Sequence, residues 1–98
     1  MIVETIPSEK LEKASEMLKA IAHPARISIV QLLGNDNKFS VTQIYEHLQM
    51  EQAVVSHHLG ILRSRDVLAS ERNGKNSLYY LKHPSLINIV NCVAGCCD

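Results

Sequence analysis

Residues Ser40 to Leu81 read SVTQIYEHLQMEQAVVSHHLGILRSRDVLASERNGKNSLYYL. Apolar residues recur at helical spacing in two consecutive segments, 41–49 and 52–65, and the short linker around Met50 leaves room only for a turn. Two strand-like segments, 67–72 and 77–81, follow and are joined through an Asn-Gly pair that suits a hairpin. Two helices followed at once by a two-stranded ribbon predict a winged helix-turn-helix. In such a fold the second helix can enter a DNA major groove while the ribbon lies along the DNA backbone.

The segment 52–65 is expected to have a buried and an exposed side. Val55, Leu59 and Leu62 recur at i, i+4 and i+7, which places them together on the side that should face the core. Gly60 in mid-helix costs roughly 1 kcal/mol relative to alanine. Either tertiary packing stabilises the helix at Gly60, or another group approaches its backbone closely in the space that a side chain would fill. The residues left pointing outward, toward the expected DNA, are Ala53, Ser56, His57 and Gly60.

Three further helices complete the expected frame. The segment 8–22 is amphipathic, and His23-Pro24 ends it because proline disfavours a helical residue before it. Proline suits the first position of a helix, so a second helix is expected over 24–33. A last helix, about 84–97, is apolar nearly all round. The apolar positions of the first helix are Leu11, Ala14, Leu18 and Ile21, and the residues expected to be buried in the second are Ile27, Ile29, Val30, Leu32 and Leu33.

Local signals mark the ends of these elements. Gly34 to Asn37 supplies a helix C-cap and a loop by turn chemistry. Ser40 followed by Gln43 is a capping-box pattern that starts the helix 41–49. The four residues Asn73 to Asn76 form the hairpin connection. The fold class is therefore mainly α with a small β-hairpin (α+β), in the order four helices, two strands, one helix.

Composition limits the kind of protein. With 98 residues, of which 46% are hydrophobic and 20% charged, the chain has room for one small winged-helix domain, residues 1–98. No signal peptide and no apolar run near the ~20 residues of a membrane span are found, so we expect a soluble, cytoplasmic protein. The excess apolar surface of the last helix predicts packing against 8–22 and against the same elements of a second copy. The terminal helices, about 8–22 and 84–97, are thus the expected homodimer interface.

Charge is distributed unevenly along the chain. The formal net charge is zero, which by itself argues against a nucleic-acid partner because phosphate neutralisation dominates such binding. Residues 1–56, however, carry five Lys/Arg against seven Asp/Glu, whereas residues 57–82 carry five Lys/Arg against two Asp/Glu. The positive surplus therefore falls on the predicted DNA-facing part, and a dimer would double it.

Three stretches carry a family resemblance: LKAIAHPARI at 18–27, VVSHHLGIL at 54–62, and Gly74 with Tyr79-Tyr80-Leu81. Together they resemble successive signatures of the ArsR/SmtB family of winged-helix repressors, over nearly the whole chain. The resemblance implies a homodimer, built through the first and last helices, that binds a partly palindromic operator in double-stranded DNA. It also implies release from the operator by an inducer, often a metal or metalloid.

The chain departs from the pattern of that family in two respects. Asp66 stands where the family usually has glycine before the first wing strand, and aspartate tolerates left-handed geometry better than most residues. The sensor sites of the family are also missing. Arsenic or cadmium sensors often carry Cys-x-Cys on the third helix, but 42–48 has no cysteine. The Asp and His pairs that zinc or cobalt sensors use along the last helix are absent as well.

Cys92, Cys96 and Cys97 are the sensor candidates that remain. At about 100° per residue, Cys92 and Cys96 lie about 40° apart on one edge of the last helix, while Cys97 falls within its apolar stripe. The three sulfurs converge only if the helix frays at Gly95. Three thiolates would suit a soft ion such as As(III), Cu(I) or Zn(II), and a pair could instead be oxidised. The alternative is that they are small apolar residues that finish a dimer helix.

The predicted DNA contacts lie on the helix 52–65 and on the hairpin. Gln52, Ser56 and His57 should donate to base edges or phosphates, as the matching family positions imply; the alternative is an idle solvated face. His58 is expected to be structural or to contact phosphate rather than to bind metal. Arg26 either contacts the DNA backbone or caps a neighbouring helix. The predicted DNA-binding residues are Gln52, Ala53, Ser56, His57, Arg63, Arg72 and Lys75.

The sequence also bears on two other function classes. An enzyme would need a nucleophile with a base, paired carboxylates or a phosphate loop, and the sequence has no such constellation, so we predict no enzymatic activity. A winged helix that binds another protein without DNA is compatible with the zero net charge. Salt dependence separates these last two alternatives, because DNA affinity falls steeply with salt.

Overall fold

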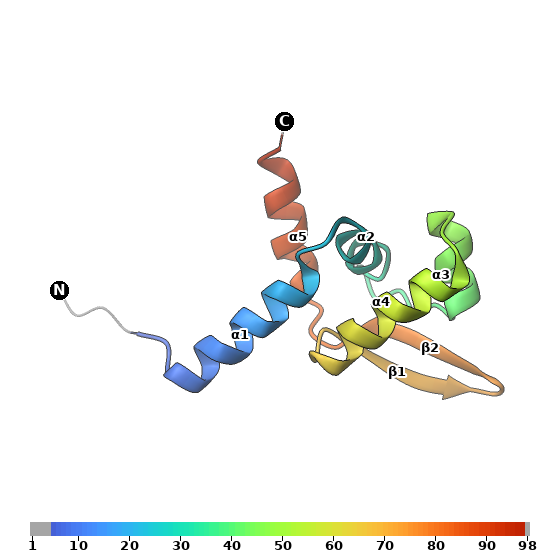
Figure 1. The fold of residues 1–98 in the computed structure, drawn as a ribbon, viewed down its shortest axis with the longest axis horizontal. Coiled ribbons are helices and arrows are strands. Elements are labelled where there is room, and N and C mark those ends of the chain that lie inside the picture. Colours follow the sequence, from blue (N-terminus) through green and yellow to red (C-terminus); the bar gives the residue numbers. More distant parts are fainter. Residues whose placement is uncertain (1–4, 98) are drawn as a thin grey trace.

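The computed structural model describes residues 5–97, and the elements in this part of the chain follow the predicted winged helix-turn-helix order (Figure 1). Helices α2, α3 and α4 form a compact body over the hairpin, while α1 and α5 leave one corner of that body in different directions (Figure 1). The elements are α1 (Ser8–Ile21), α2 (Pro24–Leu32), α3 (Val41–Leu48), α4 (Gln52–Ser64), β1 (Leu68–Asn73), β2 (Asn76–Leu81) and α5 (Leu86–Gly95).

The observed boundaries differ from the prediction mainly at the start of α5 and at the hairpin. The helix α5 begins at Leu86 rather than at Pro84, because the preceding residues form a tight turn in which the Leu86 amide donates to the His83 carbonyl at 3.0 Å. The strands extend to Asn73 and Asn76, which pair with each other, so the hairpin connection has two residues instead of four. Gly74, the first of these two, has φ 65°, a left-handed geometry that glycine adopts without steric cost.

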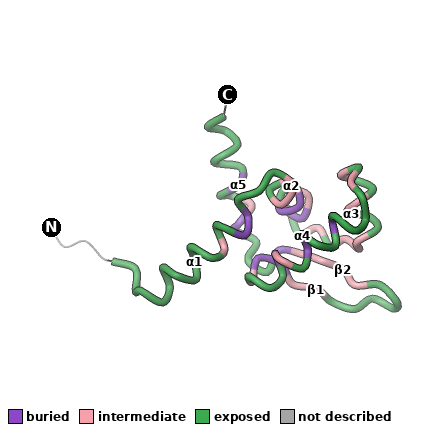
Figure 2. Tube along the Cα trace, in the orientation of Figure 1, coloured by how far each residue is buried: buried purple, intermediate pink, exposed green. Residues whose placement is uncertain are grey.

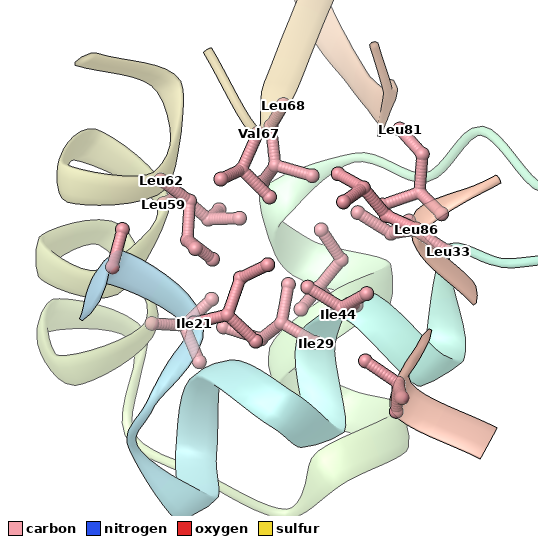
Figure 3. Close-up of a cluster of buried hydrophobic side chains, with 14 residues drawn as sticks. Ile21, Ile29, Leu33, Ile44, Leu59, Leu62, Val67, Leu68, Leu81 and Leu86 are labelled. Carbon is pink, nitrogen blue, oxygen red and sulfur yellow. The ribbon is translucent and has the colours of Figure 1, made fainter. Parts of the chain in front are cut away.

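One hydrophobic core joins all the elements (Figure 3). The predicted stripe of α4, Val55, Leu59 and Leu62, is fully buried, and Ile44 of α3 packs into the same cluster. Among the described residues no buried side-chain nitrogen or oxygen lacks a hydrogen-bond partner. The other members of the core are Ala20, Ile21, Ile29, Val30, Leu33, Val67, Leu68, Leu81, Leu86 and Val90.

The predicted apolar side of α1 is mostly exposed in this chain. Leu18 is 52% exposed, and Leu11 and Ala14 are exposed as well, because α1 reaches the core through its C-terminal end (Figure 2). Ile27 of α2 is 38% exposed, so its predicted burial was wrong. Helix α5 likewise leaves Ile89 and Val93 exposed. The molecule therefore presents large apolar side chains on both terminal helices.

Helix α5 packs against α2 in this structure. Gly34, just after α2, lies so close to Ile87 that a Cβ at position 34 would come within 2.6 Å of that side chain. Within residues 5–97, α5 and α1 diverge, so the last helix does not pack along the first as predicted (Figure 1). No helix in this range is long and apolar enough to cross a membrane.

Candidate nucleic-acid interface

The turn between α3 and α4 sets the direction of α4, which we call the recognition helix. Helix α3 starts with the predicted capping box: the Gln43 amide donates to Ser40 Oγ at 3.2 Å, and the Ser40 amide donates to Gln43 Oε1 at 2.9 Å. It ends at Gln49, whose φ of 53° is left-handed, and the Met50 amide closes the turn on the Tyr45 carbonyl at 3.1 Å. This short connection places the N-terminus of α4 beside α3, as helix-turn-helix proteins require.

The exposed side of the recognition helix carries the predicted DNA contacts. Because the buried residues of α4 occupy one side, the opposite side is turned to solvent. A Cβ at Gly60 would meet no atom within 4 Å, so no close approach within the described chain explains this glycine. The predicted residues of α4, all of them exposed, are Gln52, Ala53, Ser56, His57 and Arg63.

The hairpin forms the predicted wing and is held to the body by a third backbone segment. Phe39 pairs with Tyr79 through two backbone hydrogen bonds of 3.1 and 2.8 Å, so the loop before α3 runs beside β2. Lys38 forms an ion pair with Glu71 of β1 at 3.2 Å, and its Nζ lies 4.9 Å from the Tyr80 ring centroid. These contacts fix the base of the wing against the body of the molecule.

Ion pairs divide the basic residues between 57 and 82 into two groups. Arg65 pairs with Glu16 of α1 at 2.9 Å, and Lys82 pairs with Asp66 at 3.1 Å. Within residues 5–97, none of the remaining three takes part in an ion pair, and each is exposed. These three are Arg63, Arg72 and Lys75, the same three basic residues that the sequence predicted as DNA contacts.

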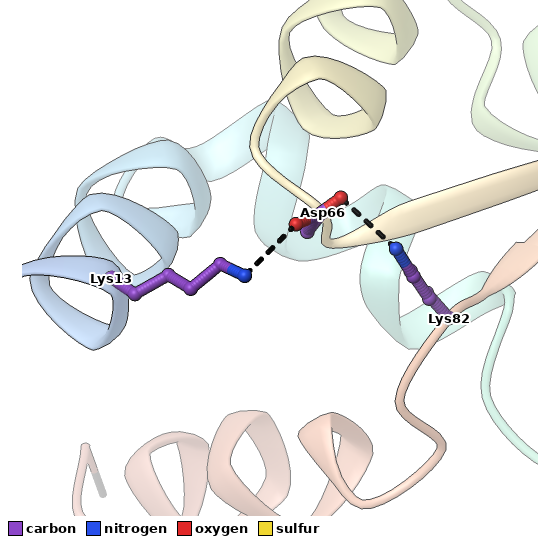
Figure 4. A network of polar contacts seen from close by, with 3 residues as sticks. All are labelled: Lys13, Asp66 and Lys82. Atoms are coloured by element: carbon purple, nitrogen blue, oxygen red, sulfur yellow. Dashed lines mark hydrogen bonds and ion pairs between the residues drawn. The ribbon is translucent and has the colours of Figure 1, made fainter. Parts of the chain in front are cut away.

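Asp66 occupies the sharp corner between α4 and β1 (Figure 4). Its φ of 62° is left-handed, which confirms that aspartate replaces the usual family glycine without loss of this geometry. The carboxylate accepts from Lys82 Nζ and lies 3.7 Å from Lys13 Nζ of α1. The hydrogen bond from Lys82, followed by the charge of Lys82, lowers the pKa of Asp66 below its ordinary value. The corner thus ties α1 and the wing to the end of the recognition helix.

Arg26 and His58 form a contact that the sequence did not reveal. Arg26 Nη1 donates to the Ala20 carbonyl in the last turn of α1 at 3.2 Å, and Arg26 Nε donates to His58 Nδ1 in α4 at 3.1 Å. Of the two predicted roles for Arg26, the structure places it as a cap on a neighbouring helix. His58 is only 7% exposed and accepts this hydrogen bond, which fits the structural one of its two expected roles.

Cys92, Cys96 and Cys97 are free and exposed near the end of α5. The Cys96 thiol donates to the Cys92 carbonyl and the Cys97 thiol to the Val93 carbonyl, each at 3.4 Å, so these two thiols turn back to their own helix. In the part of the chain that the structure describes, no group of three His, Cys, Asp or Glu residues could hold a metal ion. In this arrangement the three thiols of one chain therefore do not form a metal centre, and a soft ion would have to bring them together.

Comparisons with known proteins agree with this geometry. Residues 23–69 match the family model described as "Bacterial regulatory protein, arsR family". An uncharacterised HTH-type transcriptional regulator of Methanocaldococcus jannaschii is 33% identical over 85 residues, which cover 87% of this chain and 96% of that protein. The HTH-type transcriptional repressor SmtB of Mycobacterium tuberculosis is 39% identical over 84 residues, 86% of this chain and 62% of the length of that repressor.

A solved structure gives the same result. The crystal structure of the transcriptional repressor PagR of Bacillus anthracis is similar with a TM-score of 0.81 and 34% identity, and the match covers 89% of this chain and 99% of that one. These relatives are transcriptional regulators, and their similarity extends over the recognition helix and the wing. The chain therefore belongs to the ArsR family of winged helix-turn-helix transcriptional regulators.

Proposed function

We propose that the protein is a homodimeric repressor that binds a partly palindromic operator and places α4 of each subunit in successive major grooves. This proposal rests on the exposure of the polar side of α4 together with three cations. Arg63, Arg72 and Lys75 are also exposed, and none of them forms an ion pair within residues 5–97. Side chains on α4 would contact base edges, and the wing cations would contact phosphates. The protein is proposed to act in the cytoplasm and to have no enzymatic activity.

The exposed apolar side chains of the terminal helices support the dimer. Leu18 of α1 and Val93 of α5 are more than half exposed, and large apolar residues gathered on two helices favour burial against a second copy. Val93→Glu should therefore shift the protein from dimer to monomer in sedimentation velocity. Asn91→Glu, an exposed position on the same helix, is the matched control and should leave the dimer intact. A Val93→Glu protein that remains dimeric would contradict this interface.

The test of DNA binding is the double variant Ser56→Ala with His57→Ala. It should weaken operator binding at least tenfold while the circular dichroism spectrum and the dimer are unchanged, because both side chains are exposed on α4 and neither contributes to the core. Asn88→Ala, exposed on α5, is the control and should bind as the wild type does. Retained affinity in the double variant would remove α4 from this role.

The three terminal cysteines are the proposed site of induction. Their exposure supports this proposal, because it makes the thiols accessible to As(III), Zn(II), Cu(I) or a mild oxidant. One of these agents should release operator DNA from the wild type and not from a variant in which all three cysteines are serine. Equal release from both proteins, or release from neither, would assign no sensing role to the cysteines.

A winged-helix module that binds protein and not DNA is the alternative function. It predicts no operator binding, or an association whose strength changes little with salt. A DNA-binding dimer instead loses affinity in proportion to a power of the salt concentration.

A further inference from the structure

Arg26 connects three helices at the point where α1 joins the body of the molecule. Its guanidinium donates to Ala20 O at the end of α1 and to His58 Nδ1 in the recognition helix, at 3.2 and 3.1 Å, while its own backbone belongs to α2. The Arg26 side chain and the Ala20 carbonyl are partly buried, and hydrogen bonds from a charged donor are stronger than neutral ones. One side chain thus holds the carbonyl end of α1 against α4.

The position of α1 depends on few other contacts. Its buried residues are Ala20 and Ile21, both in the last turn, and the rest of the described helix extends away from the body (Figures 1 and 2). The two ion pairs between α1 and the end of α4, Glu16 with Arg65 and Lys13 with Asp66, join side chains that are largely exposed. Exposed pairs of this kind each contribute little to stability, so they hold α1 in place less firmly than its partly buried end does. The angle between α1 and α4 is therefore set mainly at the C-terminal turn of α1.

We infer that Arg26 is a positioning residue for operator binding, which fixes the angle between the dimer helix α1 and the recognition helix α4 through Ala20 and His58. In a dimer built on α1, this angle sets the distance between the two recognition helices and so the half-site spacing that fits. The inference rests on the proposed function, because it assigns Arg26 a role only in a dimer bound to DNA.

The contact with His58 requires an unprotonated Nδ1. A neutral imidazole can offer a lone pair to Arg26 Nε, whereas an imidazolium has two N–H donors and no acceptor. The groups that face His58 are Arg26 of α2, His23 just before α2, with a ring centroid distance of 4.7 Å, and His57 of α4 at 5.6 Å. Burial first, and then the charges of His23, Arg26 and His57, lower the pKa of His58. The acceptor is therefore available at neutral pH, and the contact is lost on acidification.

The test is a double-mutant cycle in operator binding. Arg26→Gln and His58→Leu should each weaken binding about tenfold, and the double variant should bind no more weakly than either single one, since both remove the same contact. His58→Asn keeps an acceptor oxygen near the place of Nδ1 and should restore binding to within about threefold of the wild type. Arg26→Lys, which keeps the charge but not the forked geometry, should also lose affinity, and it provides the measurement if Arg26→Gln does not fold.

Half-site spacing gives the readout that a merely structural role would not change. The wild type should prefer its natural spacing over operators lengthened by one or two base pairs by at least tenfold, and Arg26→Gln should reduce this preference to about twofold or less. If Arg26 instead contacts a phosphate, its loss would lower the slope of log affinity against log salt by about one per contact and leave the spacing preference intact. That result, or equal affinities in all folded variants, would overturn the inference. Failure of the wild type to bind any DNA would refute the proposed function, and the positioning role with it.

Discussion

Replacing Arg72 and Lys75 by glutamine should reduce the slope of log operator affinity against log salt concentration. Both side chains are exposed on the wing, and neither forms an ion pair within residues 5–97, so each is available to a phosphate. A dimer presents four such cations. Because the slope of log affinity against log salt is about 0.9 per phosphate contact, the variant should lose about 3.6 units of slope.

This difference is large over an ordinary range of salt. Between 50 and 200 mM, four phosphate contacts account for a loss of about 150-fold in affinity that the variant would no longer show. Fluorescence anisotropy of labelled operator at five salt concentrations measures both slopes. Lys10→Gln with Lys19→Gln removes the same charge from α1 and should leave the slope unchanged. Equal slopes in the wing variant and the wild type would refute the assignment of the wing to the DNA backbone.

Three further predictions concern the recognition helix and its support. Gly60→Ala should raise the free energy of unfolding by about 1 kcal/mol, seen as a melting temperature about 4–8 °C higher, because a Cβ there meets no atom within 4 Å; an unchanged or lower melting temperature would show that the glycine is needed. Leu59→Ala should lower the free energy of unfolding by about 2.7–5 kcal/mol in urea denaturation, since Leu59 is fully buried, and a loss below 1 kcal/mol would contradict the described core. Because the pKa of His58 is lowered in the fold, the unfolded chain takes up a proton first. The free energy of unfolding should therefore fall as the pH drops below about 6.5 and stop falling once folded His58 is protonated. His58→Asn should reduce this loss between pH 8 and 5, and an identical pH profile in both proteins would contradict the shifted pKa.

Local sequence signals predicted the elements that surround the DNA-facing surface. The capping box at Ser40 and Gln43 formed as expected because it needs only atoms three residues apart. The stripe of Val55, Leu59 and Leu62 fixed the rotation of α4, and so identified its exposed side without a structure.

At other positions the sequence allowed more than one backbone conformation and did not indicate which one forms. Within the predicted cap and loop from Gly34 to Asn37, the residues in left-handed geometry are Asn35 and Asp36, with φ of 60° and 63°. Gly34 is needed instead for its small size, since Ile87 of α5 lies against it. Gln49, an unremarkable residue in the sequence, takes the left-handed position that turns α3 into α4. Tertiary contacts decided each of these conformations.

Long-range contacts were the main part that sequence reasoning missed. Arg26 and His58 are 32 residues apart, and no spacing rule joins them. The 52% exposure of Leu18 has a related cause, because an amphipathic pattern predicts that a helix has an apolar side and not whether its own chain or a second copy covers it. In the sequence, a helix side that packs into the core and one that packs into a dimer interface show the same pattern of apolar residues.

We propose that the protein, as a dimer, recognises a specific DNA sequence. The most direct test is an anisotropy titration of the reduced protein with labelled DNA from upstream of its own gene, against a scrambled duplex of equal length at about 150 mM salt. We predict that the upstream DNA binds at least about 1,000-fold more tightly, as specific regulators do, and that Ser56→Ala with His57→Ala removes most of this preference. Equal affinity for both duplexes, or no binding to either, would contradict the account.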